Sequence, residues 1–388
     1  MTIKDLDKKY IANTYGRADV VFTHGHGAEV YDDVGNRYID LGSGIAVNAF
    51  GCADEVWAQA VTEQLNKLQH MSNLYYTEPC VKLAELLCQR TGMRRVFFGN
   101  SGAEANECAI KTARKWAFDK YGDESHSTII TLKNSFHGRT ISTLAATGQD
   151  GFHTKFGPFT PGFVYASAQD AGEVRAFAEK GNCCAVMIEL IQGEGGVVPL
   201  ERAYVDEVVN IARERDLLII VDEVQTGNGR TGTLYAFQQF GFMPDIVSTA
   251  KGLGGGLPLG ACMLGEKVAN TLTAGTHGST FGGNPVCCAG AISVISRIDD
   301  ALSAEVKAKG EYIKKELTGA KGVKSITGMG LMIGILTDKP AGEVVKAALQ
   351  RGVVALTAHE KVRLLPPLSI SMDQLTEAIQ ILKEVIAE

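Results

Sequence analysis

The stretch IIVDEVQTGNGRTG, residues 219 to 232, changes from apolar to polar residues at a single position, and this change indicates the fold. It begins as an apolar, β-branched run and continues with two carboxylates, an amide and several glycines. A short apolar run of this kind is typical of a strand buried on both faces, as in a parallel sheet. Ligands gather at the carboxyl ends of such strands, so Asp222, which ends the run, is a candidate site residue.

Similar apolar runs recur along the chain and alternate with helical patterns. Strands are expected at 95–98, 128–132, 185–189, 218–221 and 245–249. Helices are expected at 53–69, 78–91 and 102–119. This alternation predicts βαβ units and therefore an α/β fold with a mostly parallel sheet.

The two ends of the chain have a different pattern. Residues 28–41 alternate apolar and polar side chains around a turn, which predicts a hairpin. After about residue 283 longer amphipathic helices are expected, at 284–298, 302–318, 341–351 and 372–387. With a few strands between them, these helices predict a second, α+β domain.

Composition excludes several classes of function. The net charge is −6 and the basic residues are scattered, which argues against nucleic acid as a partner. No apolar run approaches the roughly 18 residues that span a bilayer. The first ten residues, MTIKDLDKKY, have charges where a signal peptide needs an apolar stretch, so a cytoplasmic protein is expected. The nine cysteines include no Cys-x-x-Cys pair and indicate reduced thiols. His24 and His26 have no partner cluster, so no metal site is expected.

Residues 97–107, FFGNSGAEANE, predict a strand, a turn and a helix start. Ser101, Gly102 and Ala103 would place free backbone N–H groups and the positive helix end around an anion such as a phosphate. The known mononucleotide and dinucleotide motifs do not fit. No Gly-Lys dipeptide occurs, and GLGGGLPLG (252–260) lacks the Gly-x-Gly-x-x-Gly spacing.

A serine hydrolase is a rival interpretation of the same turn. Gly99-Asn100-Ser101 is similar to a nucleophile elbow, and Ser101, Asp222 and His277 follow the chain order of one known triad. The elbow requires glycine where Ala103 stands, which weighs against this interpretation.

Asp222 and Lys251 follow two successive predicted strands. A carboxylate at a buried strand end is costly without a donor or cation, and the simpler interpretation of Asp222 alone is a helix cap or an ion pair with arginine. Lys251 precedes the glycines of GLGGGLPLG, and burial lowers the pKa of such an amine, which then becomes a nucleophile. An aldehyde on the lysine, a pyridinium on the aspartate and a phosphate on the helix end are the requirements of pyridoxal 5'-phosphate.

On these residues the chain resembles the class III aminotransferases of fold type I. The resemblance runs from about residue 10 to the carboxyl terminus. It is carried, in order, by SGIAVNAFG, SNLYYTEP, FFGNSGAEANE, FHGRT, QGEGGVVP, DEVQTGNGRTG, AKGLGGGLPLGA, THGSTFGGNP and RLLPPL. It implies an aspartate aminotransferase-like fold with a large cofactor-binding domain, 51–282, around a seven-stranded, mostly parallel sheet. A smaller α+β domain would combine residues 1–50 and 283–388.

The resemblance also implies roles for the cofactor-binding residues. Lys251 would hold the cofactor and move the proton, and Asp222 would keep the ring nitrogen protonated. Gln225 would contact the ring hydroxyl and Phe136 would stack on the ring; the simpler alternatives are a loop amide and a core phenylalanine. The phosphate would be bound by the turn at Ser101, Gly102 and Ala103 and by Thr280 of a neighbouring subunit, which implies a homodimer with active sites at the interface.

Substrate contacts are implied in the same way. Arg139 matches an arginine that grips a substrate carboxylate, and its simpler alternative is an ion pair on a helix surface. Ser279 resembles a substrate contact at the subunit interface. Glu194 and Arg363 resemble a pair in which the glutamate masks the arginine for one substrate and frees it for the α-carboxylate of glutamate.

The amino donor depends on fewer positions. Gly44 stands where ornithine aminotransferases carry a tyrosine, and would leave room for an N-acyl group; Tyr15 is expected to line the pocket too. The expected reaction is that of acetylornithine aminotransferases in arginine biosynthesis, from N-acetylornithine to 2-oxoglutarate by a ping-pong route. N-succinylornithine, N-succinyl-diaminopimelate, ornithine and 4-aminobutyrate stay open as donors, as does an aminomutase. The chain departs from the family at Cys52 and Leu190, and neither position is a proposed catalytic group.

Overall fold

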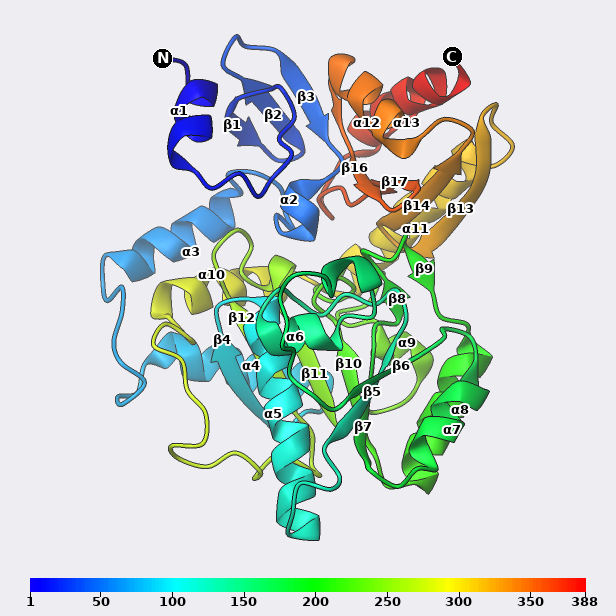
Figure 1. The fold of residues 1–388 in the computed structure, drawn as a ribbon. Coiled ribbons are helices and arrows are strands. Elements are labelled where there is room, and N and C mark those ends of the chain that lie inside the picture. Colours follow the sequence, from blue (N-terminus) through cyan, green and yellow to red (C-terminus); the bar gives the residue numbers. More distant parts are fainter.

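The computed structural model describes residues 1–388. Its largest sheet occupies the lower body of the molecule in Figure 1 and has seven strands. Their order is β4 (Arg95–Gly99), β12 (Gly260–Leu264), β11 (Ile246–Thr249), β10 (Leu218–Asp222), β7 (Cys183–Ile188), β5 (Thr128–Leu132) and β6 (Phe163–Ala166). Only β12 runs antiparallel to its neighbours. The predicted α/β fold with a mostly parallel seven-stranded sheet is confirmed.

Helices bury both faces of this sheet. Leu218 and Ile220 of β10 pack in one apolar cluster with α5 (Gly102–Tyr121), whereas Ile219 and Val221 belong to a larger cluster on the other face. α8 (Arg202–Glu214) contributes to that larger cluster and packs on α7 (Ala171–Ala178). Burial on both faces explains why the strand is a continuous apolar run instead of an alternating one.

The N- and C-terminal segments lie side by side at the top of Figure 1. One small sheet has the order β1 (Phe22–His26), β2 (Glu29–Asp32), β3 (Arg37–Asp40) and β15 (Val353–Val354), so that a C-terminal strand extends the N-terminal hairpin. Another has the order β13 (Val323–Met329), β14 (Met332–Thr337), β17 (Lys361–Leu364) and β16 (Leu356–Ala358). Three helices pack against these sheets: α11 (Asp300–Leu317), α12 (Ala341–Gln350) and α13 (Met372–Ala387). The smaller α+β part is thus present, while the domain limits at residues 50 and 282 stay predictions.

The other helices, strands and turns complete the chain. They are α1 (Ile3–Tyr10), α2 (Ser43–Ala46), α3 (Glu55–Leu65), α4 (Glu78–Thr91), α6 (Ile141–Ala146), the 3-10 turn η1 (Asp150–Phe152), β8 (Ile191–Gln192), β9 (Val198–Pro199), α9 (Phe237–Phe240), the 3-10 turn η2 (Lys251–Leu253) and α10 (Pro285–Ile295). None of the helices combines the length and apolar character needed to cross a membrane. All nine cysteines are free thiols, His24 and His26 are exposed, and no group of residues is arranged to hold a metal ion.

Candidate active site

A cavity of about 490 Å³ opens at the carboxyl ends of the parallel strands. Most of the residues expected at the site line it. These are Ser101, Gly102, Ala103, Phe136, Arg139, Glu194, Asp222, Gln225 and Lys251. They come from turns that follow several different strands, because parallel strands bring these turns to the same edge of the sheet.

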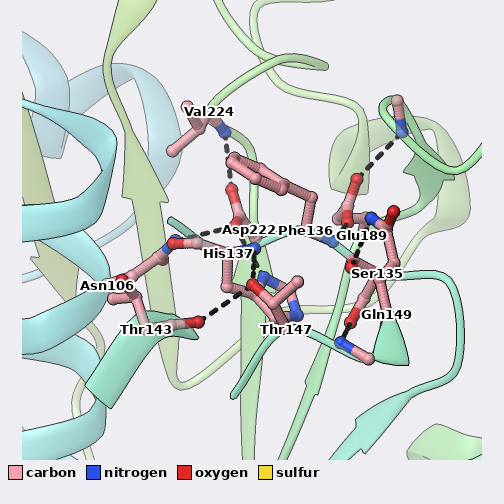
Figure 2. A network of polar contacts seen from close by, with 12 residues as sticks. Asn106, Ser135, Phe136, His137, Thr143, Thr147, Gln149, Glu189, Asp222 and Val224 are labelled. Carbon is pink, nitrogen blue, oxygen red and sulfur yellow. Dashed lines mark hydrogen bonds and ion pairs between the residues drawn. The ribbon is translucent and has the colours of Figure 1, made fainter. Parts of the chain in front are cut away.

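Asp222 is fixed at the end of β10 by three hydrogen bonds (Figure 2). Its Oδ2 accepts from Asn106 Nδ2 and from His137 Nδ1, both at 2.8 Å, and its Oδ1 accepts from the backbone N–H of Val224 at 3.0 Å. The carboxylate is almost fully buried. Neither simple alternative applies, since Asp222 caps no helix and forms no ion pair with arginine.

Glu189 joins two of the turns that form the cavity wall (Figure 2). One carboxylate oxygen accepts from the N–H of Phe136 at 2.7 Å and the other from the N–H of Gly193 at 2.9 Å. Burial raises the pKa of Glu189 to about 7, and the negative charge of Asp222 adds to this shift. The carboxyl therefore ties the backbone at Phe136 to the turn that carries Glu194.

Sequence reasoning missed Asn106, His137 and Glu189. Glu189 carried the same signal as Asp222, a carboxylate at the end of an apolar parallel strand. His137 directly follows Phe136 in the FHGRT motif. Asn106 gave no local signal, since it lies on a helix 116 residues from the carboxylate it contacts.

Lys251 begins η2, two residues after β11 ends. Its backbone is left-handed, with φ of 45°, an unfavourable conformation for a residue with a side chain. Its amine lines the cavity and makes no hydrogen bond or ion pair with the chain. Burial lowers the pKa of Lys251, and the guanidinium of Arg363 lowers it further, although Glu194 opposes this. The site thus presents an amine that is more nucleophilic than an exposed lysine.

The helix start at α5 is open to a ligand. Ser101 caps the helix, because its hydroxyl accepts from the N–H of Glu104 at 3.2 Å. The N–H groups of Gly102 and Ala103 have no acceptor within the chain. A Cβ added at Gly102 would lie 2.7 Å from Val224 Cγ1, so a larger residue would require Val224 or the backbone to shift. Two free amides at the positive end of a 20-residue helix suit a phosphate group.

Arg363 does not line the cavity itself but forms a polar cluster with Glu194 and Gln225, which do. Arg363 Nη1 donates to Glu194 Oε1 at 2.6 Å and to Gln225 Oε1 at 3.1 Å. Gln225 Nε2 donates to Glu194 Oε1 at 3.3 Å. Burial alone would raise the pKa of Glu194, but Arg363 outweighs this and holds it below the ordinary value. The arginine is therefore masked in this structure, apart from its Nε, which is buried without a partner.

Arg139 lies in the turn before α6, with its side chain at the cavity. It forms no ion pair or hydrogen bond, and its guanidinium lies against aromatic rings instead. The alternative interpretation, an ion pair on a helix surface, does not describe it. Its N–H donors are all available to a ligand.

Four expected residues lie elsewhere. Tyr15 is 69% exposed and does not line the cavity. Gly44 lies in α2, in a left-handed conformation, three residues before the cavity-lining Val47. Ser279 and Thr280 line a separate cavity of about 330 Å³ next to Phe97.

The serine hydrolase triad does not assemble. The Ser101 hydroxyl accepts from the N–H of Glu104 at the start of α5, and Asp222 binds His137. His277 contacts Lys111 and packs on Phe97, away from Asp222. This rival interpretation is wrong.

The groups around the main cavity fit a cofactor with an aldehyde, a basic ring nitrogen and a phosphate. A free amine, a fixed carboxylate, an aromatic ring and open helix amides all line this one cavity. The family model described as aminotransferase class III matches residues 10–386. The chain therefore belongs to the class III aminotransferases, which are enzymes that depend on pyridoxal phosphate.

Particular relatives cover the whole chain. The chain is 53% identical over 388 residues to an acetylornithine aminotransferase from Haemophilus ducreyi, covering 100% of this chain and 98% of the relative. The structure of an ornithine aminotransferase from Toxoplasma gondii superposes with a TM-score of 0.94 at 31% identity, covering 99% of this chain and 94% of the other. An N-acetylornithine aminotransferase from Stenotrophomonas maltophilia gives a TM-score of 0.86 at 35% identity, with 99% and 98% covered.

Proposed function

We propose that this enzyme transfers the δ-amino group of N-acetyl-L-ornithine to 2-oxoglutarate, giving N-acetyl-L-glutamate 5-semialdehyde and L-glutamate. The observation that carries the chemistry is the unpaired amine of Lys251 in one cavity with the fixed carboxylate of Asp222. The full-length likeness to acetylornithine aminotransferases supports the choice of donor. The reaction belongs to arginine biosynthesis.

Pyridoxal phosphate, when bound, supplies an electron sink for the carbanion at the substrate carbon. Lys251 Nζ would bind its aldehyde and carry the proton between donor carbon and cofactor. Asp222 would hold a proton on the ring nitrogen, and the hydrogen bonds from Asn106 and His137 keep that carboxylate aimed. Phe136 would stack on the ring, and Gln225 would bind the ring hydroxyl.

The phosphate would be bound by the amides of Gly102 and Ala103 at the start of α5, next to Ser101. Their lack of an acceptor within the chain supports this assignment.

Two arginines would bind substrate carboxylates. Arg139 is free of partners and would bind the α-carboxylate of the donor, at about 1.5 to 3 kcal/mol for each charged hydrogen bond. Arg363 is paired with Glu194, which must move aside before the α-carboxylate of glutamate can bind. The same pocket could thus accept two different substrates in the two half-reactions.

Room for the N-acyl group would come from Gly44, because glycine has no side chain. Tyr15 would reach the pocket only after a rearrangement or from another subunit. N-succinylornithine and N-succinyl-diaminopimelate would fit the same space. Ornithine, 4-aminobutyrate and an aminomutase reaction are the further alternatives.

A homodimer is part of the proposal. Ser279 and Thr280 would serve the site of the neighbouring subunit, which is supported by their position in a separate cavity of their own chain. Nearby apolar side chains are exposed, among them Leu74, Tyr76 and Phe281. We also infer a cytoplasmic enzyme, since nine free thiols suit a reducing compartment.

A panel of amine donors with 2-oxoglutarate tests the proposed function. N-acetyl-L-ornithine is expected to give the highest kcat/KM, above N-succinyl-L-ornithine, N-succinyl-diaminopimelate, L-ornithine and 4-aminobutyrate. A higher kcat/KM for either unacylated donor would contradict the proposed donor, while leaving the aminotransferase class intact.

A further inference from the structure

The guanidinium of Arg139 is oriented by aromatic rings alone. Its Cζ lies 4.6 Å from the ring centre of Phe152 and 5.7 Å from that of Phe136. No acidic side chain pairs with it, and Glu107 on α5 is instead bonded to Thr140 and Thr143. A guanidinium over an aromatic face is held by cation–π attraction without using any of its N–H donors.

Phe152 is better placed than Phe136 to provide this restraint. It is nearer, and its ring meets that of Phe136 edge-on, with centroids 5.9 Å apart and an angle of 67°. Phe136 is the residue proposed to stack on the cofactor ring, and that contact would occupy one face of the Phe136 ring. Phe152 has no contact proposed with either the cofactor or the substrate.

The backbone on both sides of Phe152 is fixed independently of its ring. Gln149 Nε2 donates to the carbonyl of Ser135 at 3.0 Å, which ties this turn to the loop of Phe136 (Figure 2). His153 Nε2 lies 3.0 Å from the carbonyl of Leu144 on α6. Removal of the Phe152 ring should therefore leave the path of the chain unchanged.

From this geometry we propose that Phe152 is a positioning residue for Arg139. Its ring holds the guanidinium at the cavity with the donor edge free for a substrate carboxylate. This inference rests on the proposed function, in which Arg139 binds the α-carboxylate of the donor. Phe152 then contributes to the choice between amines with and without a carboxylate, although it touches neither.

The test compares two donors that differ only in that carboxylate, N-acetyl-L-ornithine and N-acetyl-1,4-diaminobutane. Phe152→Ala and Phe152→Leu are both expected to raise KM for N-acetyl-L-ornithine about 3- to 10-fold, with kcat within about twofold. For N-acetyl-1,4-diaminobutane, kcat/KM should change less than about twofold. Phe152→Tyr, which keeps the aromatic face, should restore the wild-type preference.

Equal losses on both donors would overturn the inference, since they would indicate a purely structural role. Wild-type behaviour of Phe152→Leu would overturn it as well, because leucine fills space without an aromatic face. Arg139→Ala separates this inference from the proposed function. If that variant keeps the preference for the carboxylate donor, the assignment of Arg139 itself is wrong; if it loses the preference and the Phe152 variants do not, only the role of Phe152 is wrong.

Discussion

At Lys251 two unfavourable features meet in one residue. The backbone is left-handed, and the amine is desolvated with no acceptor in the chain. Residues in such conformations persist only where the surrounding structure holds them, and they concentrate at functional sites. Both features lower the stability of the folded chain, and in the proposed function this amine is the group that reacts.

Lys251→Ala is expected to abolish turnover and the visible absorbance of bound pyridoxal phosphate. In the cofactor-free protein the same variant should melt at the same temperature as the wild type or higher, because a desolvated amine is removed. Thermal unfolding of both proteins after dialysis against a scavenging amine checks this. A lower melting temperature for the cofactor-free variant would mean that Lys251 has a structural partner.

The site residues that could be predicted from the sequence are those marked by a pattern in their own neighbouring residues. Asp222 and Lys251 each follow an apolar run, and a charged group in that position is unusual enough to suggest function. His137 could not be assigned to Asp222 in the same way, since 85 residues separate them. Their contact depends on the crossover that brings the turn after β5 to the end of β10.

The start of α5 is the element on which the proposed phosphate binding depends. Gly102 allows Val224 to pack against the helix start, and an added Cβ would collide with it at 2.7 Å. The Val224 side chain, the helix start or the turn after Asp222 would have to move, and all three belong to the cavity wall.

Gly102→Ala is expected to weaken binding of pyridoxal phosphate about tenfold or more, as the free amides shift from the phosphate position. Fluorescence titration of the cofactor-free protein measures this. Gly342→Ala is the matched control, because Gly342 lies near the start of α12 with no atom within 4 Å of an added Cβ. It should leave cofactor affinity unchanged and stabilise the protein by up to about 1 kcal/mol. Equal affinities in the two variants would contradict the phosphate assignment.

Elements with strong local signals were predicted closely. The helix expected at 78–91 is α4 with the same limits, and that expected at 372–387 is α13. β12 was missed, because Gly260, Ala261 and Cys262 are small residues with little intrinsic preference for strands. Its pairing with β4 and β11 depends on tertiary contacts that no local pattern contains.

At the scale of the whole molecule, the site depends on joining distant segments. Arg363 of β17 reaches Glu194, 169 residues earlier in the chain. Arg230 reinforces the same junction, since its Nη1 donates to the carbonyls of Leu331 and Pro366. The C-terminal segment therefore supplies the cation that pairs with Glu194 in the wall of a cavity built mainly on the large sheet.

Two buried carboxyl groups should make stability depend on pH. Burial raises the pKa of Glu223 to about 7, and the pKa of Glu189 is raised to about 7 as well, from an ordinary value of 4.5. Between pH 4.5 and about pH 7 the folded chain binds more protons than the unfolded chain, because these carboxyl groups are still protonated only in the folded chain. The free energy of unfolding therefore falls as the pH rises. Each group costs up to about 3 kcal/mol above pH 7.

Glu223→Gln is expected to remove one of these contributions. Its amide can still accept from the N–H of Phe237 and donate to Thr226, so the packing is kept. The variant should match the wild type near pH 4.5 and exceed it by about 3 kcal/mol at pH 8. Urea unfolding across this range checks the prediction, with the exposed Glu124→Gln as control. Parallel pH profiles for Glu223→Gln and the wild type would contradict it.

The central claim is that the amine of Lys251 binds the cofactor covalently. Borohydride reduction of the holoenzyme, digestion and mass spectrometry test it most directly. We predict one pyridoxyl-modified peptide, with the added mass on Lys251. Modification of a different lysine, or of none, would contradict the account.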